Sequence, residues 1–214
     1  MKCKRRGVIV LLLALWATPA MAMNMSQLEA AKERAGMLDQ VRTLLADDSA
    51  SVRLAVFEEV MKSDDPVLRS MALESAFSSG DERLQTAGLR QLFQDRELLS
   101  VEVIEPREPS QAQAYTFQLW RELMLKELRI DQATDELSGS FNGARASGKF
   151  VGHLTRGGWR VDLSWAGYSC SLELTQVSGV DLSGALRCAI TGRHAREGNA
   201  GGQSATLPFR IRLS

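Results

Sequence analysis

From residue 137 onward, apolar and polar residues alternate along six successive segments. Apolar residues that mark them are Leu137, Phe141, Phe150, Leu154, Trp159, Val161, Leu163, Leu172, Leu174, Leu182, Leu186, Leu207, Phe209 and Ile211. Successive side chains of a strand point to opposite faces, so each segment would carry one apolar face. The pattern predicts a six-stranded antiparallel β-meander with one buried face. We expect a curved sheet or a partial barrel.

The composition changes near residue 136. Residues 23–136 contain 22 acidic and 13 basic residues and few glycines, whereas residues 137–214 contain 4 acidic and 9 basic residues and many glycines. This contrast predicts an α+β chain built from two different parts. We expect a helical region at 23–96, a linker at 97–110, a bridging helix at 111–136 and a β-domain at 137–214.

Three similar segments, each about thirteen residues long, follow a longer helical pattern at residues 26–45. They span residues 49–61, 65–77 and 81–93. Each begins with Ser or Asp, whose side chain can accept hydrogen bonds from the free N–H groups of a first helical turn. Pro66 suits such a turn as well. The segments predict short antiparallel helices that bury their apolar faces by stacking.

Two of these segments contain the pieces "VRLA" at residues 52–55 and "LRSMA" at residues 68–72. In these pieces, residues 49–93 resemble the HEAT and armadillo class of helical repeats. The resemblance implies a scaffold that contacts other proteins, and it assigns no binding residue. An ordinary small helical bundle is the alternative interpretation.

Residues 97–127 differ from both parts. Val101 and Val103 alternate with acidic residues before Pro106 and Pro109, which indicates a short strand or an extended linker. Large apolar side chains then crowd residues 111 to about 127 and cover more than one helical face. We expect this segment to be a helix that bridges the helical part and the sheet.

The N-terminus has the pattern of a secretory signal peptide. Four basic residues precede an apolar run at residues 7–16, and Ala20 and Ala22 give the A-x-A pattern of a cleavage site. Cleavage after Ala22 would leave 192 residues in the periplasm or outside the cell, without a stable transmembrane anchor. An uncleaved anchor is the alternative.

Cys170 and Cys188 would be the only cysteines left after cleavage. A two-residue loop at residues 166–167 pairs Leu163 with Cys170, and a hairpin centred on Gly179 pairs Cys170 with Cys188. Directly opposed residues of antiparallel strands lie within the reach of a disulfide. We therefore predict a structural disulfide. A redox-active pair is the alternative, although the C-x-x-C spacing is missing.

Basic residues near the C-terminus form the candidate binding site. A register that pairs Cys188 with Phe209 puts Arg187 opposite Arg210, and like charges in this position cost stability unless they are compensated. Either the acidic helical part or an anionic ligand could compensate them. The candidate residues for binding an anion or a partner are Arg187, Arg193, Arg196, Arg210 and Arg212.

Candidates for chemistry are few. His153, His194 and Asp162 are the only residues that we would consider, and no catalytic motif, cofactor site or metal site is predicted. The sequence predicts an exported, non-enzymatic protein-interaction or scaffold module of the cell envelope, whose partner is another envelope or secreted protein. The alternative is a protein that binds a small ligand, an anionic glycan or a lipid through the basic β-domain. Nucleic acid is not an expected partner, because the basic excess is small.

Overall fold

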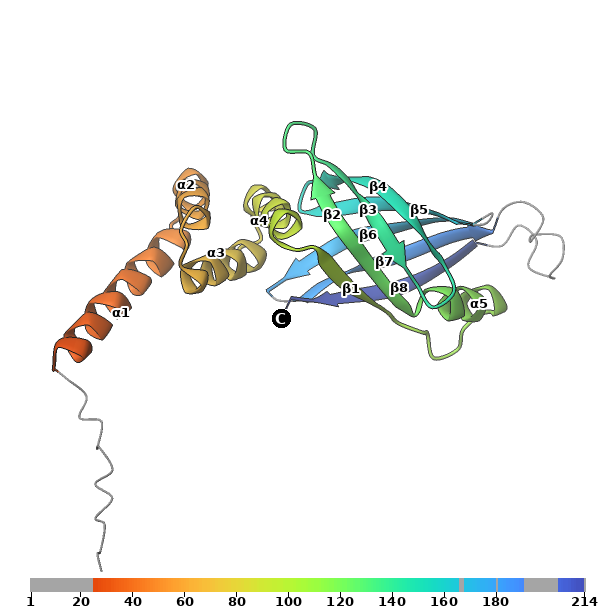
Figure 1. Ribbon diagram of the computed structural model, residues 1–214, viewed down its shortest axis with the longest axis horizontal. Coiled ribbons are helices and arrows are strands. Elements are labelled where there is room, and N and C mark those ends of the chain that lie inside the picture. The colour runs from red at the N-terminus through yellow and green to blue at the C-terminus, as the bar shows by residue number, and fades with distance from the viewer. Residues whose placement is uncertain (1–24, 166–167, 180, 191–203, 214) are drawn as a thin grey trace, which may run out of the picture. The chain divides into compact units, whose positions relative to one another are not determined.

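The computed structural model describes residues 25–165, 168–179, 181–190 and 204–213 (Figure 1). The chain divides into two compact units, residues 1–37 and residues 38–214. Helix α1 (Met25–Leu45) begins in the first unit and ends in the second. The second unit contains the other helices and an antiparallel β-barrel, and it is the subject of the following paragraphs.

Three short helices follow α1, as the sequence predicts. They are α2 (Ala50–Met61), α3 (Pro66–Ser78) and α4 (Glu82–Asp95). The side chain of Asp65 accepts a hydrogen bond from the backbone N–H of Val67, and Asp81 does the same for Arg83 and Leu84. These contacts satisfy N–H groups that have no partner within the helix, and they fix where α3 and α4 begin.

Helices α3 and α4 approach each other closely. A Cβ atom at Gly88 would lie 2.9 Å from the ring of Phe77 and 3.2 Å from the Cβ of Ala76, so only glycine fits at this position of α4. An ion pair between Arg69 of α3 and Asp95 of α4 joins the same two helices. Ala72 and Ala76 are fully buried beneath them. Small residues thus allow the backbones to pack tightly.

The β-part is a closed barrel of eight antiparallel strands in chain order. The strands are β1 (Leu98–Val103), β2 (Glu122–Ile130), β3 (Glu136–Asn142), β4 (Ser147–Thr155), β5 (Gly158–Trp165), β6 (Tyr168–Ser178), β7 (Asp181–Ile190) and β8 (Ser204–Arg212). Every strand places apolar side chains in the interior. Examples of these buried residues, one for each strand from β1 to β8, are Val101, Leu123, Leu137, Phe150, Val161, Leu172, Leu186 and Leu207.

The predicted six-stranded curved sheet or partial barrel is therefore wrong, because two further strands close the sheet. The segment 97–110, predicted as a linker, contains β1, which pairs with both β2 and β8. The predicted helix at 111–136 ends at Trp120, and β2 begins at Glu122. Closure pairs the two edges that a six-stranded sheet would leave open, and unpaired edges invite association with other chains.

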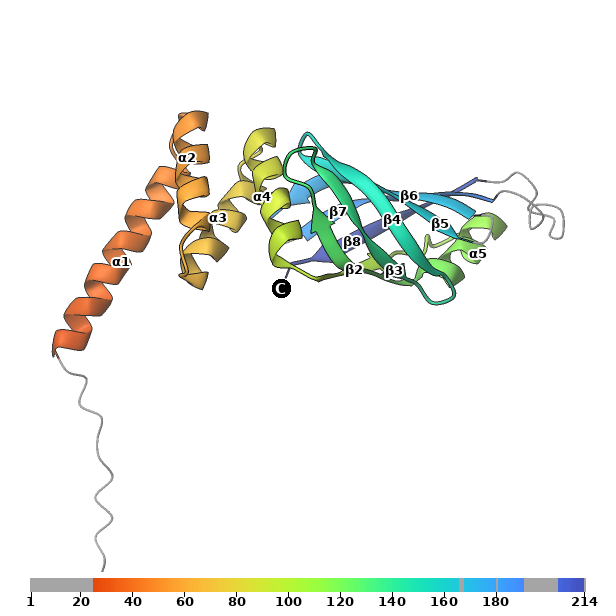
Figure 2. The same ribbon diagram turned by 45° about the horizontal axis from the view of Figure 1, so that its top comes forward.

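Helix α5 (Gln111–Trp120) lies in the connection between β1 and β2. Ser110 and Gln113 form a reciprocal capping box at its start. Its last residue, Trp120, is fully buried and packs against Phe141 of β3 at a ring-centroid distance of 5.4 Å. The expectation that this helix bridges the helical part and the sheet is not met. The helix lies at the end of the barrel opposite to α4 (Figure 1, Figure 2).

Helix α4 makes most of the contacts that join the helices to the barrel, and α3 also contacts β6. Phe93 meets Trp159 of β5 edge to face, with ring centroids 6.0 Å apart. The guanidinium of Arg90 donates two hydrogen bonds of 2.9 Å to the carboxylate of Asp135 in the β2–β3 turn. In the β4–β5 turn, the backbone N–H of Gly157 donates to the hydroxyl of Thr86. One apolar and two polar contacts therefore fix α4 on the barrel.

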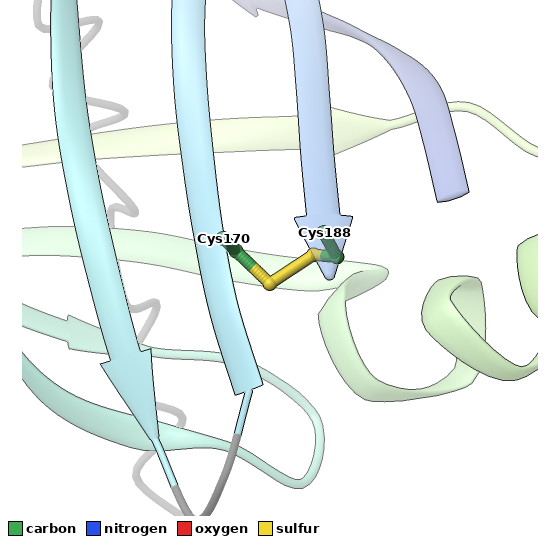
Figure 3. The surroundings of a disulfide bond; sticks show 2 residues. All are labelled: Cys170 and Cys188. Carbon is green, nitrogen blue, oxygen red and sulfur yellow. A yellow bond between two sulfur atoms is a disulfide. The ribbon is translucent and has the colours of Figure 1, made fainter. Parts of the chain in front are cut away.

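The cysteine prediction is confirmed. Cys170 and Cys188 are directly opposed on β6 and β7 and form a disulfide, with an S–S distance of 2.07 Å and a Cα–Cα distance of 4.0 Å (Figure 3). The predicted pair of Leu163 with Cys170 is present as well, because the turn between β5 and β6 is short. The opposition of Cys170 and Cys188 also depends on a β-bulge between Leu174 and Gln176, which was not predicted. Within the part of the chain that the structure describes, no helix is both long enough and apolar enough to cross a membrane.

Candidate functional site

The predicted pairing of Arg187 with Arg210 is wrong. Arg187 on β7 lies opposite Thr206, and Arg210 on β8 lies opposite Ser183. Cys188 likewise pairs with Ala205 rather than with Phe209. The connection between β7 and β8 is long, so it does not dictate the register as a two-residue turn does. The like-charge contact that suggested an anionic ligand is therefore not present.

Each of the three described candidate arginines has a carboxylate neighbour. Arg210 pairs with Glu102 of β1 at 2.8 Å, across the strand pair that closes the barrel. This ion pair holds the pKa of Glu102 below its ordinary value. Arg187 lies 3.7 Å from Glu173, and Arg212 lies 3.9 Å from Asp181. Arg193 and Arg196 lie outside the described residues. The barrel itself thus supplies the counter-charges for these three arginines.

A polar hollow of about 390 Å³ lies on the outer wall over strands β5 to β8. Arg160, Asp162 and Arg187 line it together with several serine and threonine hydroxyls. Arg160 lies 3.4 Å from Asp162, so acidic groups already neighbour both arginines of the hollow. An anion bound there would have to compete with these carboxylates.

His153 and Asp162, two of the residues considered for chemistry, are exposed on neighbouring strands of the barrel. His153 is exposed on β4, where it pairs in register with Glu136 and Arg160. Asp162 is exposed on β5 beside Arg160, and His194 lies outside the described residues. Among the residues that the structure describes, no group of three or more His, Cys, Asp or Glu side chains could hold a metal ion.

The barrel interior is filled by side chains. Trp159 lies between Phe93 of α4 and Phe209 of β8, at 6.0 Å from each ring centroid, and is fully buried. Phe150 and Leu163, which pair across β4 and β5, are buried with it. This arrangement is the packed core of a small barrel rather than a ligand chamber.

The helical part presents a groove instead. A hollow of about 610 Å³ lies between α2, α4 and the β4–β5 turn, and an adjoining hollow of about 280 Å³ continues along α2 and α4. Both are lined by Glu58, Ala87 and Arg90, so they form one continuous depression, which we call the α2–α4 groove. Its size is in the range of ligand-binding clefts.

The groove has an apolar floor and charged walls. The apolar floor consists of Leu54 of α2 and Ala87 of α4, which are half-buried, whereas Phe57 and Met61 are buried in the helical core beneath it. The charged and polar residues that line it are Glu58, Lys62, Glu82, Arg83, Thr86, Arg90, Gln91 and Arg156. An apolar floor with charged walls is suited to an amphipathic peptide segment.

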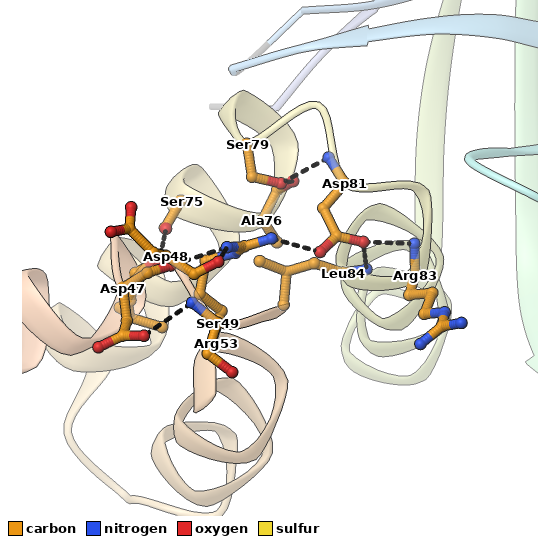
Figure 4. Close-up of polar contacts among 11 residues, drawn as sticks. Asp47, Asp48, Ser49, Arg53, Ser75, Ala76, Ser79, Asp81, Arg83 and Leu84 are labelled. Carbon is orange, nitrogen blue, oxygen red and sulfur yellow. Dashed lines mark hydrogen bonds and ion pairs between the residues drawn. The ribbon is translucent and has the colours of Figure 1, made fainter. Parts of the chain in front are cut away.

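One ion pair sets the spacing of the groove walls. The guanidinium of Arg53 on α2 donates to the carboxylate of Asp81 at the start of α4 over 2.6 Å, and both side chains are mostly buried. The same guanidinium donates to the backbone carbonyls of Asp47 and Asp48 (Figure 4). Arg53 therefore ties the α1–α2 loop, α2 and α4 together.

The sequence interpretation missed the groove residues. Helical periodicity places Glu58 and Ala87 away from the most buried faces of their helices, but it does not show that these two surfaces face each other. Arg156 reaches the groove from a β-turn about 70 residues farther along the chain than Arg83. No local signal in the sequence connects these positions.

Comparison of the chain with protein-family models, with curated protein sequences and with solved structures gave no match in any of the three. The resemblance of residues 49–93 to helical repeats therefore stays a prediction.

Replacement of Asp81 by Asn should remove the ion pair with Arg53 but keep the helix cap, since Asn also caps helices well. The hydrogen bond from Arg53 lowers the pKa of Asp81 in the folded chain, against the opposing effect of burial. The pair therefore stabilises the fold above the unfolded-state pKa, and this contribution is lost as the pH falls through the lower folded-state pKa. We expect D81N to lower the free energy of unfolding by about 1–3 kcal/mol at pH 7.

Urea unfolding from pH 7 to pH 2.5 measures this effect. The difference between wild type and D81N should stay constant down to about pH 5 and shrink below about pH 4. Asp39→Asn is the control, because Asp39 forms an exposed pair with Arg42 and should change the stability by less than about 0.5 kcal/mol. A difference that is unchanged at pH 3 would contradict the assigned role of the Arg53–Asp81 pair.

Proposed function

We propose that this chain is an exported, non-enzymatic protein-interaction module of the cell envelope. In this proposal, the barrel is a rigid base, and the α2–α4 groove binds a helical segment of another envelope or secreted protein. The observation that carries the proposal is the groove itself, a continuous depression with an apolar floor that lies beside a barrel whose interior is filled.

The physical support comes from how the groove is held. Helix α4 forms one wall and is attached to the barrel by Arg90, Thr86 and Phe93. The other wall, α2, is tied to α4 by the Arg53–Asp81 pair. A preformed groove loses little conformational entropy when a ligand binds, so more of the contact energy is available for affinity.

The export part of the proposal rests on the N-terminal pattern and on the disulfide. Disulfides persist in oxidising compartments such as the periplasm and the extracellular space. The chain expressed with residues 1–22 in a secreting host should be recovered from the secreted fraction. Its intact mass should lack residues 1–22 and two hydrogens. Recovery with the full N-terminus, or with two free thiols, would contradict export.

The binding part is tested with Glu58→Trp, which puts a large ring where the two hollows meet. Glu58 is exposed, so the fold should tolerate the change. A phage-displayed library of helical peptides with random faces is selected against the folded chain. Enriched peptides should bind the E58W variant at least about tenfold more weakly than wild type, because the ring occupies the groove.

Glu74→Trp is the matched control. Glu74 is exposed on α3, and it lines neither hollow of the groove. Peptides should bind E74W as they bind wild type. A selection that enriches no peptide, or enriched peptides that bind E58W unchanged, would contradict the proposed function.

A further inference from the structure

We propose that the outer wall of the barrel has a second binding site, which takes a neutral polyhydroxylated ligand, the chemistry of an uncharged oligosaccharide. The site is the polar hollow over β5 to β8. It shares no lining residue with the α2–α4 groove, so it goes beyond the proposed protein interaction. Three observations carry the proposal: the shape of the hollow, its unused hydrogen-bonding groups and the balance of its charges.

The strand register builds the hollow from two rows of outward-facing residues. The first row crosses the four strands as Asp162, Ser171, Arg187 and Thr206. The second row crosses β6, β7 and β8 as Ser169, Ala189 and Ser204. Neighbouring strands lie about 4.8 Å apart, and same-face residues of one strand lie about 6.8 Å apart. The hollow is therefore a regular grid of side chains on one face of the sheet.

The second row forms a floor of short side chains. Ser169, Ala189 and Ser204 are all exposed, and the longer side chains of Arg160 and Arg187 line the same hollow. The short row leaves a depression of about 390 Å³ beside these longer groups. This volume is near the lower end of the range of small-ligand sites. It suits a small polar molecule or the end of a longer chain of sugar rings.

The hollow presents hydroxyl groups that the barrel does not use. The hydroxyls of Ser169, Ser171, Ser204 and Thr206 make no hydrogen bond with any other residue that the structure describes. Each hydroxyl is both a donor and an acceptor. The hydroxyls of a polyol have the same two capacities, so such a ligand can replace the water at these groups with equivalent hydrogen bonds.

The charges of the hollow favour a neutral ligand. Arg160 donates from Nε to Asp162 over 3.4 Å, and Arg187 lies 3.7 Å from Glu173, which is longer than a hydrogen bond. All four side chains remain partly exposed. An anion would meet the two carboxylates, and a cation would meet the two guanidinium groups. A guanidinium or a carboxylate that faces a sugar can instead bind two neighbouring hydroxyls at once.

The barrel holds these groups in place before a ligand binds. The disulfide of Cys170 and Cys188 joins β6 and β7 from the buried side, directly beneath the floor (Figure 3). On β8, the carbonyl oxygen of Thr206 accepts a hydrogen bond of 3.1 Å from the side-chain amide of Gln113. Because the strands are fixed, binding costs little conformational entropy.

An array of neutral oligosaccharides, with sulfated and uronic-acid oligosaccharides on the same array, tests the ligand class. The folded chain with its disulfide should bind neutral oligosaccharides. A rise in NaCl from about 50 mM to about 500 mM should change this binding by less than about twofold, because no net charge is neutralised. The tightest neutral oligosaccharide is then titrated by NMR. The amide shifts should change most at Ser169, Ser171, Arg187, Ala189 and Ser204.

Two variants test the position of the site. Ser169→Trp puts a large ring on the floor and should weaken binding of that oligosaccharide at least about tenfold. Asp162→Ala removes an acceptor from an exposed position and should weaken binding about fivefold. Ser100→Trp is the matched control. Ser100 is an exposed serine of β1 that does not line the hollow, and S100W should change the affinity by less than about twofold.

The site is overturned if the array shows no neutral ligand or only anionic ligands. Neutral binding that is unchanged in S169W and D162A, or NMR shifts that centre elsewhere, would overturn it as well. The Glu58→Trp variant of the groove should bind the oligosaccharide as wild type does. Failure of the hollow therefore leaves the groove function standing, and failure of the groove leaves the hollow standing.

Discussion

The edge-to-face contact of Phe93 with Trp159 connects the two kinds of structure in this chain. It puts a side chain of α4 into the same buried cluster as the barrel residues, so the helix belongs to the barrel core as well as to the helical part. Aromatic pairs of this kind contribute stability beyond the area that they bury. The Arg90–Asp135 contact fixes the orientation of the helix about that point.

The groove follows from this attachment. One side of α4 packs on the barrel, and the side that carries Ala87 and Arg83 forms a groove wall. Arg53 then positions α2 relative to α4 through Asp81. Because each wall is fixed by buried or partly buried contacts, the groove exists before any ligand binds. The barrel, with its filled interior, provides rigidity to this arrangement.

The sequence predicts the parts of the fold that depend on short-range patterns. The pair Leu163 and Cys170 could be placed because the turn between β5 and β6 is short, whereas the opposition of Cys170 and Cys188 also depends on a β-bulge between Leu174 and Gln176. The strand β2 was predicted as helix because large apolar side chains crowd residues 111 to about 127, although residues 122–130 form a strand. Barrel closure and the groove depend on contacts between distant segments, such as β1 with β8 and Thr86 with Gly157, and no local pattern encodes them.

Native-state hydrogen exchange tests most directly whether α4 belongs to the barrel core. Amides that exchange only through unfolding of a shared cooperative unit report the same opening free energy. The slowest amides of α4 should therefore match those of β5 and β6 across a series of denaturant concentrations. If the α4 amides open at a clearly lower free energy than these strands, the helix is not part of the barrel core, and the account of a groove held rigidly by the barrel is contradicted.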